Sequence, residues 1–214
     1  MADDENRMKT GTTTVAVKCK DCVIMAADKR ATAGHLIANK WVDKIFIIED
    51  NMAITTAGTV SDVQLLLKLI KAELRLKRLR TGRKVTVSEA ANLLAGMVYS
   101  NIRKLSAIPG ISHFLFAGAD ETGFHLYDIY PDGSISEADD YLASGSGSVF
   151  AFGVLETLYQ PSLSVEDGKT LALKSVNAAL QRDSASGNGV DIVVIKPAGA
   201  EKVLTQKIET GIKT

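Results

Sequence analysis

The sequence has few of the features that mark secreted, membrane-bound or nucleic-acid-binding proteins. None of its apolar runs approaches the ~18–20 residues of a membrane span. Residues 1–11 (MADDENRMKTG) lack the apolar core of a secretory signal. The 25 basic and 25 acidic residues give a formal net charge of zero, so no overall field attracts nucleic acid or anionic lipid. We therefore expect a cytoplasmic protein that has neither a nucleic acid nor a membrane as its partner.

Cysteine and histidine are scarce, which limits metal, redox and serine-protease chemistry. Cys19 and Cys22 are the only cysteines and form a C-x-x-C, which is typical of redox or metal motifs. Tetrahedral zinc needs two further ligands, and the three histidines, His35, His113 and His125, are scattered. The cysteines flank two polar residues between two apolar runs, so we favour a β-hairpin without thiol chemistry. We expect no metal and no cofactor.

Two further stretches resemble binding motifs only superficially. The run RLKRLRTGRK (75–84) holds six basic residues but no stacking aromatics, so we interpret it as the solvated end of a helix rather than a nucleic-acid site. The segment ASGSGSV (143–149) lacks the Gly-Lys-Ser/Thr ending of a phosphate loop. A G-x-S-x-G nucleophile elbow is also missing. None of the three histidines lies in a context that suggests a base, so if the chain is an enzyme, its base is not expected to be a histidine.

Hydrophobic periodicity predicts strands and helices in alternating blocks. Strands are expected at 12–19, 22–28, 43–50, 51–58, 113–120, 124–130 and 190–196, with a short one near 203–204. Helices are expected from Ser61 (boxed with Gln64), from Thr86 (boxed with Glu89) to about residue 105, over 149–159, and from Ser164 (boxed with Asp167) to about Arg182. This order differs from the βαβα alternation of a parallel sheet. We predict one α+β domain, a four-layer αββα sandwich of two antiparallel sheets flanked by helix pairs.

The stretch RMKTGTTTVAV (7–17) places three threonines between a glycine and an expected strand. Threonine suits strands, so the simple interpretation is that the run begins that strand. A threonine at a freed N-terminus is also a nucleophile, because its α-amine titrates near ~7.7–8 and can accept the hydroxyl proton. Gly11 suits a cleavage point before Thr12, since it has no side chain to crowd an attacking hydroxyl. The run alone leaves both interpretations open.

Stretches along nearly the whole chain resemble the β-type subunits of the proteasome core particle, most closely the archaeal ones. These are TGTTTVAV (10–17), ADKRAT (27–32), DKIF (43–46), TTAG (55–58), GSGS (145–148), GVLE (153–156) and RDSASG (182–187). The resemblance implies the αββα fold of N-terminal-nucleophile hydrolases and a threonine endopeptidase that degrades unfolded proteins to short peptides. It implies that residues 1–11 are a propeptide removed by self-cleavage of the Gly11–Thr12 bond, and that residues 12–214 form the peptidase domain.

The same resemblance assigns the catalytic groups. Thr12 Oγ attacks the scissile carbonyl to give an acyl-enzyme, beside a catalytic lysine, Lys44, and its paired carboxylate, Asp28. The backbone N–H of Gly58 corresponds to the oxyanion-hole donor. The polar groups that hold the freed amine correspond to Ser146, Asp183 and Ser186.

The resemblance also extends to the substrate side. Arg30 matches the family, and Thr32 is expected to hydrogen-bond a substrate that binds as an added strand. The residues expected around the specificity pocket are Ala31, Val42, Phe46, Thr56 and Val60. They are mostly apolar, so we predict cleavage after hydrophobic residues. Asp43 departs from relatives that often carry a basic residue before the lysine; it either stabilises the Lys44 ammonium or draws it away from Thr12.

The implied partners are the other subunits of the particle. β-Subunits of this family form heptameric rings enclosed by α-subunit rings, and a separate ATP-driven unfoldase delivers unfolded polypeptide, so no ATP site is expected here. The main alternative is a structural β-subunit without catalysis, but such subunits generally lose the threonine or the lysine. An α-subunit lacks the Gly-Thr junction, and RDSASG and GVLE argue against the bacterial two-ring relative.

Overall fold

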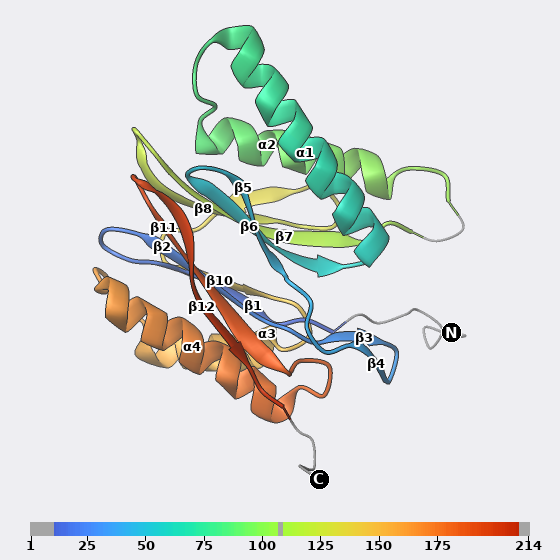
Figure 1. Ribbon diagram of the computed structural model, residues 1–214, viewed down its shortest axis with the longest axis vertical. Helices are drawn as coiled ribbons and strands as arrows, with labels where there is room; N and C mark the ends of the chain where they lie inside the picture. Colours follow the sequence, from blue (N-terminus) through green and yellow to red (C-terminus); the bar gives the residue numbers. More distant parts are fainter. Residues whose placement is uncertain (1–10, 107–108, 210–214) are drawn as a thin grey trace.

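A computed structural model of the chain describes residues 11–106 and 109–209, whose helices and strands stack in four layers. Figure 1 shows one helix pair above two sheets and a second pair below them. Every strand pairing within the described ranges is antiparallel. The predicted αββα sandwich is confirmed.

The first sheet contains the strand that follows Thr12. Its order is β10-β1-β2-β11-β12. The strands are β1 (Thr14–Lys18), β2 (Val23–Asp28), β10 (Tyr141–Ser144), β11 (Gly189–Lys196) and β12 (Gly199–Lys207). Almost every residue of β1 and β2 is buried, as expected for strands that are covered on both faces.

The second sheet has the order β5-β6-β7-β8-β9. Its strands are β5 (Ile45–Glu49), β6 (Met52–Gly58), β7 (Ser112–Asp120), β8 (Gly123–Ile129) and β9 (Ile135–Glu137). A small separate sheet joins β3 (Ala31–Ala33) to β4 (Leu36–Asn39). It lies in the connection between β2 and β5, so the chain from Asp28 to Lys44 passes through it.

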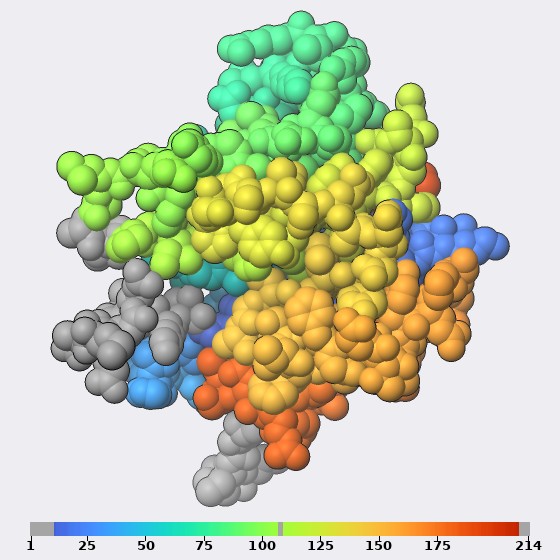
Figure 2. Space-filling view, turned by 180° about the vertical axis from the view of Figure 1, so that it is seen from behind, coloured from blue at the N-terminus to red at the C-terminus, as the bar shows by residue number. Residues whose placement is uncertain are grey.

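The helices cover the outer faces of the two sheets. They are α1 (Val60–Thr81), α2 (Val87–Ile102), α3 (Ser148–Leu158) and α4 (Val165–Arg182). The first two pack on the second sheet and the last two on the first sheet. Viewed from behind, in space-filling form, the segment from β9 to α3 covers the middle of the molecule (Figure 2). The buried cluster between the sheets is rich in alanine, which lets the sheets pack closely.

Local signals predicted two helix starts correctly and one incorrectly. Thr86 and Glu89 form the expected capping box, and Ser164 Oγ accepts the Asp167 N–H at 3.2 Å. The prediction of a helix start at Ser61 is wrong: α1 begins at Val60 with Thr59 as its extended N-cap, without a side-chain cap bond. The chain turns into the helix directly after β6, so Ser61 is already helical.

Several strands lie where none was predicted. The strands β3, β4, β9 and β10 have only three or four residues each. Such short segments carry too few residues for a period-two pattern to stand out. The last strand, β12, spans Gly199–Lys207 and is largely exposed, so it is much longer than the short strand expected near 203–204.

Candidate active site

Thr12 lies just before β1, at one end of the layer between the two sheets. Only 4% of the residue is exposed. Its Oγ1 donates a hydrogen bond to the Gly11 carbonyl oxygen at 2.7 Å, and the Gly11 N–H donates to Thr32 Oγ1 at 2.8 Å. The residue before the predicted nucleophile is therefore held at both of its backbone polar groups.

Gly11 packs so closely that no side chain fits there. A Cβ at this position would overlap the backbone and Cβ of Ala185, in the loop between α4 and β11. From the sequence, Gly11 was expected because a residue without a side chain does not crowd the attacking Thr12 hydroxyl. The contact with Ala185 adds a second steric reason, which becomes visible only once the loop is in place.

Lys44 and Asp28 form a buried ion pair beside Thr12. Lys44 Nζ lies 2.6 Å from Asp28 Oδ1 and donates to the Gly11 carbonyl oxygen at 3.2 Å. Burial lowers the pKa of Lys44, and the Asp28 carboxylate opposes that effect. The lysine expected to favour an alkoxide thus contacts the same oxygen as the Thr12 hydroxyl.

Four donors fix the Asp28 carboxylate. Besides Lys44, its Oδ1 accepts the Thr13 N–H at 2.8 Å, and its Oδ2 accepts the N–H groups of Arg30 and Gly187, both at 3.0 Å. This carboxylate therefore joins the start of β1, the end of β2 and the loop after α4. Gly187 was not predicted as a site residue, because its part is played by the backbone alone.

The three residues predicted to hold the amine lie together. The Thr12 N–H donates to Ser146 Oγ at 3.3 Å, and the hydroxyls of Ser146 and Ser186 donate to Asp183 Oδ2 at 2.6 and 2.7 Å. Thr13, which the sequence analysis treated only as a strand residue, extends this network, with its Oγ1 2.6 Å from Ser186 Oγ. The network therefore reaches Thr12 from the turn before α3 and from the end of α4.

Two glycines of the GSGS segment allow this approach. Gly145 has φ +92°, and a Cβ there would overlap the Thr12 carbonyl group. A Cβ at Gly147 would overlap Thr13 Oγ1. The segment that superficially resembled a phosphate loop is thus a close packing surface for the start of β1.

Asp43 turns toward neighbours other than Lys44. Its Oδ1 accepts from Lys29 Nζ at 2.9 Å and from Lys202 Nζ at 3.4 Å. Lys29 Nζ also lies 2.6 Å from Asp191 Oδ2, and both of those side chains are buried. Asp43 therefore belongs to a separate charge network, and Asp28 is the carboxylate that pairs with Lys44.

The residues predicted on the substrate side lie around this end of the second sheet. The Thr56 N–H donates to the Lys44 carbonyl at 3.0 Å, and the Val42 N–H donates to the Lys29 carbonyl at 2.9 Å. Gly58 ends β6 with φ +118°. Ala31 and Phe46 are half-buried, and Val60 is exposed as the first residue of α1. Their roles in specificity and in an oxyanion hole stay predictions.

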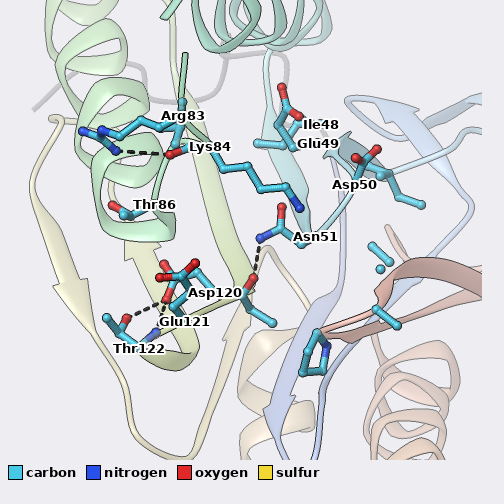
Figure 3. Close-up of a pocket in the computed structure, with 17 residues that line it drawn as sticks. Ile48, Glu49, Asp50, Asn51, Arg83, Lys84, Thr86, Asp120, Glu121 and Thr122 are labelled. Atoms are coloured by element: carbon cyan, nitrogen blue, oxygen red, sulfur yellow. Dashed lines mark hydrogen bonds between the residues drawn. The ribbon is translucent and has the colours of Figure 1, made fainter. Parts of the chain in front are cut away.

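A large open groove of about 1170 Å³ lies elsewhere, at the far end of β5 from Lys44. Figure 3 shows Glu49, Asp50, Lys84, Asp120 and Glu121 around it. They lie at the β5–β6 turn, at the β7–β8 turn and in the connection between α1 and α2. It contains none of the residues of the Thr12 site. Within the described ranges, no three His, Cys, Asp or Glu residues are grouped so as to hold a metal ion.

A model of the family described as proteasome subunit matches residues 8–195. The chain belongs to the proteasome subunit family. Among curated relatives, the proteasome subunit beta of Archaeoglobus fulgidus is 43% identical over 191 residues, which cover 89% of this chain and 88% of the relative. Those of Archaeoglobus profundus and Methanothermobacter thermautotrophicus are 39% and 38% identical and cover 98% and 96% of this chain and 95% of each relative.

Family membership confirms the resemblance drawn from the sequence motifs and makes this chain a component of a multisubunit proteasome particle. In the described part of the proteasome subunit, no helix is long and apolar enough to cross a membrane.

Proposed function

We propose that this proteasome subunit is a threonine endopeptidase that cleaves unfolded polypeptides through an acyl-enzyme on Thr12. The observation that carries the proposal is that Thr12 Oγ1 and Lys44 Nζ both bind the Gly11 carbonyl oxygen, at 2.7 and 3.2 Å. Attack on a carbonyl requires a hydroxyl within reach and positive charge near the oxygen that becomes anionic. Both groups lie at the bond that self-cleavage would break.

The first proposed reaction is self-cleavage. Thr12 Oγ bonds to the Gly11 carbonyl carbon, the bond from that carbon to the Thr12 nitrogen breaks, and the hydroxyl proton passes to that nitrogen. Water then hydrolyses the resulting ester. Residues 1–11 leave as a propeptide with a new carboxylate, and Thr12 keeps its hydroxyl and a free α-amine.

The second reaction repeats this attack on a substrate. The freed amine accepts the proton of Thr12 Oγ as that oxygen bonds to the substrate carbonyl carbon, and the proton passes to the departing amine. Water hydrolyses the acyl-enzyme. Ser146, with Asp183 and Ser186 behind it, holds the amine, the Lys44 ammonium favours the alkoxide, and the Gly58 N–H stabilises the oxyanion. Thr32, which accepts the Gly11 N–H at 2.8 Å, would accept the matching substrate N–H.

The substrate and the partners follow from the same proposal. Ala31, Val42, Phe46, Thr56 and Val60 would surround the side chain before the scissile bond, and most of them are apolar. We infer cleavage after hydrophobic residues. The subunit would act in the cytoplasm, in a heptameric β-ring enclosed by α-rings, on chains delivered by an ATP-dependent unfoldase.

Intact mass spectrometry of the particle assembled with its α-subunits tests this function. We expect the mature subunit to lack residues 1–11 and to hydrolyse a fluorogenic peptide. Thr12→Ala should keep residues 1–11 and hydrolyse no peptide. Peptidase activity in that variant would refute the nucleophile. A wild-type subunit that keeps residues 1–11 and has no activity would instead indicate the structural β-subunit.

A further inference from the structure

His113, Asp128 and Ser144 form a chain of hydrogen bonds that connects the two sheets. His113 Nε2 lies 2.5 Å from Asp128 Oδ1, and His113 Nδ1 lies 2.8 Å from Ser144 Oγ. His113 is on β7 and Asp128 on β8, whereas Ser144 ends β10 in the other sheet. None of these residues was predicted as functional.

This network of His113, Asp128 and Ser144 is not a second nucleophilic site. Ser144 is 3% exposed, so a peptide cannot reach its hydroxyl. His113 Nε2 bonds to the Asp128 carboxylate, and Nδ1 shares a hydrogen bond with the Ser144 hydroxyl. The three side chains therefore form a tie, a hydrogen-bonded link between the two sheets.

The tie contacts segments on two sides of the Thr12 site. Ser144 pairs with Thr14 in the sheet and is followed by Gly145 and Ser146, which contact the Thr12 carbonyl and N–H. On the other side, His113 pairs with Ala57, the neighbour of Gly58. The hydrogen bond between Ser144 and His113 therefore joins the segment that holds Thr12 to β7, the strand paired with the end of β6 that carries the proposed oxyanion donor.

We propose that His113 is a positioning residue for the Thr12 site, which it serves by holding Ser144 and the Gly145–Ser146 turn in register with β6. The inference rests on the proposed peptidase function.

A second arrangement of Ser144 is available within the sheet. Directly paired residues of antiparallel strands point to the same face, so Thr14 Oγ1 lies beside the Ser144 side chain. Thr14 Oγ1 is buried and makes no hydrogen bond to the described residues. Without the bond to His113, the Ser144 hydroxyl can bond to Thr14 instead, and the turn that follows Ser144 is re-aimed.

The side chains of two residues, one on β8 and one just after it, face His113. They are Asp128 and Tyr130, whose ring stacks on the imidazole at 5.3 Å between centroids. The neighbours on β6 and β10, Ala57 and Ser144, carry no charge. His113 is therefore held by one carboxylate, one aromatic ring and one hydroxyl.

Three variants of the assembled particle test the proposal by peptide hydrolysis. Ser144→Ala removes only the hydroxyl and should lower kcat about fivefold to tenfold, the worth of one buried hydrogen bond, with KM changed less than about twofold. His113→Phe keeps an aromatic ring against Tyr130 and should lower kcat by a similar factor. Because both changes break one tie, the double variant should lose no more than the single ones.

His113→Gln tests whether the two hydrogen bonds of His113, rather than its ring, hold the site. An amide has a donor for Asp128 and an oxygen that can accept from Ser144. It should restore most of the kcat lost in His113→Phe. The matched control is His125→Phe: His125 lies on β8 and also bonds through both nitrogens, to Thr122 and Glu137, but with no contact to the Thr12 network. It should leave kcat unchanged.

Each variant has a result that would overturn the proposal. Additive losses in the double variant, or an unchanged kcat in Ser144→Ala, would mean that the tie does not position Thr12. A His113→Gln variant that is as slow as His113→Phe would mean that the hydrogen bonds of His113 do not position the site. Mass spectrometry shows whether residues 1–11 are lost in each variant. If Thr12→Ala itself retains activity, the proposed function fails rather than this inference.

Discussion

Lys44 Nζ lies 2.6 Å from Asp28 Oδ1, and the exposed fractions of the two side chains are 5% and 0%. Neither charged group is solvated by water. Removing one partner of such a buried pair typically costs about 3–5 kcal/mol, because the other charge is left uncompensated. The free energy of unfolding and the proposed chemistry therefore depend on the same contact.

Asp28→Asn should lower the free energy of unfolding by about 3 kcal/mol or more and abolish loss of residues 1–11. Asp28→Glu keeps the charge and should retain measurable self-cleavage. Thermal unfolding and intact mass report the two effects separately. An Asn variant that matures at the wild-type rate would show that the pair is structural only.

The contact between Gly11 and Ala185 predicts a compensating pair of substitutions. Gly11→Ala should slow self-cleavage, because its Cβ would overlap Ala185 and displace the Gly11 carbonyl from Thr12 Oγ1. Ala185→Gly, added to that variant, should restore the rate by making room. The fraction of mature subunit over time, read by mass spectrometry, measures both.

This pair also separates a contact in the precursor from a general defect. Gly11 is absent from the proposed mature subunit, so any Gly11→Ala particles that do mature should have the wild-type kcat. A Gly11→Ala variant that matures normally would show that the loop moves aside at no cost.

The sequence was sufficient to predict the layers, and it named several residues that the structure brings together around Thr12. Amphipathic patterns and turns report local preferences, and these agreed with the sandwich because each helix pair buries one face on one sheet. Resemblance supplied Thr12, Asp28 and Lys44, which then lay in contact.

The rest depends on contacts between distant segments. Gly187 binds Asp28 through its backbone, and Gly145 and Gly147 matter only because Thr12 and Thr13 pack on them. No spacing in one sequence reports such contacts. His113 was dismissed as isolated because its partners, Asp128 and Ser144, are 15 and 31 residues away along the chain.

Asp43 offers a test of which carboxylate serves Lys44. Asp43→Asn should leave kcat within about twofold, since half-exposed ion pairs contribute little and its partners are Lys29 and Lys202. Asp191→Asn should instead lower the free energy of unfolding by about 3 kcal/mol or more, because it deprives the buried Lys29 of its nearest anion. Peptidase assays and thermal unfolding of both variants compare the two networks. A tenfold loss of kcat in Asp43→Asn would reassign Asp43 to the active site.

Glu89 predicts a pH dependence at the start of α2. Its hydrogen bonds from Arg83 and from the Thr86 N–H lower its pKa to about 2, from an ordinary 4.5. A carboxyl with a lowered pKa stabilises the fold above its ordinary pKa, and this stabilisation is lost as the pH falls from about 4.5 toward 2.

Glu89→Gln keeps the capping geometry but loses the charge, so it should lower the free energy of unfolding at pH 7 by at most about 1 kcal/mol, as expected for an exposed pair. Urea unfolding followed by circular dichroism should show the wild type and the variant converging as the pH approaches about 2. Glu166→Gln, which alters the exposed pair with Lys169 on α4, is the control: it should change the free energy of unfolding less at every pH, and an equal effect would mean that the α2 cap adds nothing beyond surface charge.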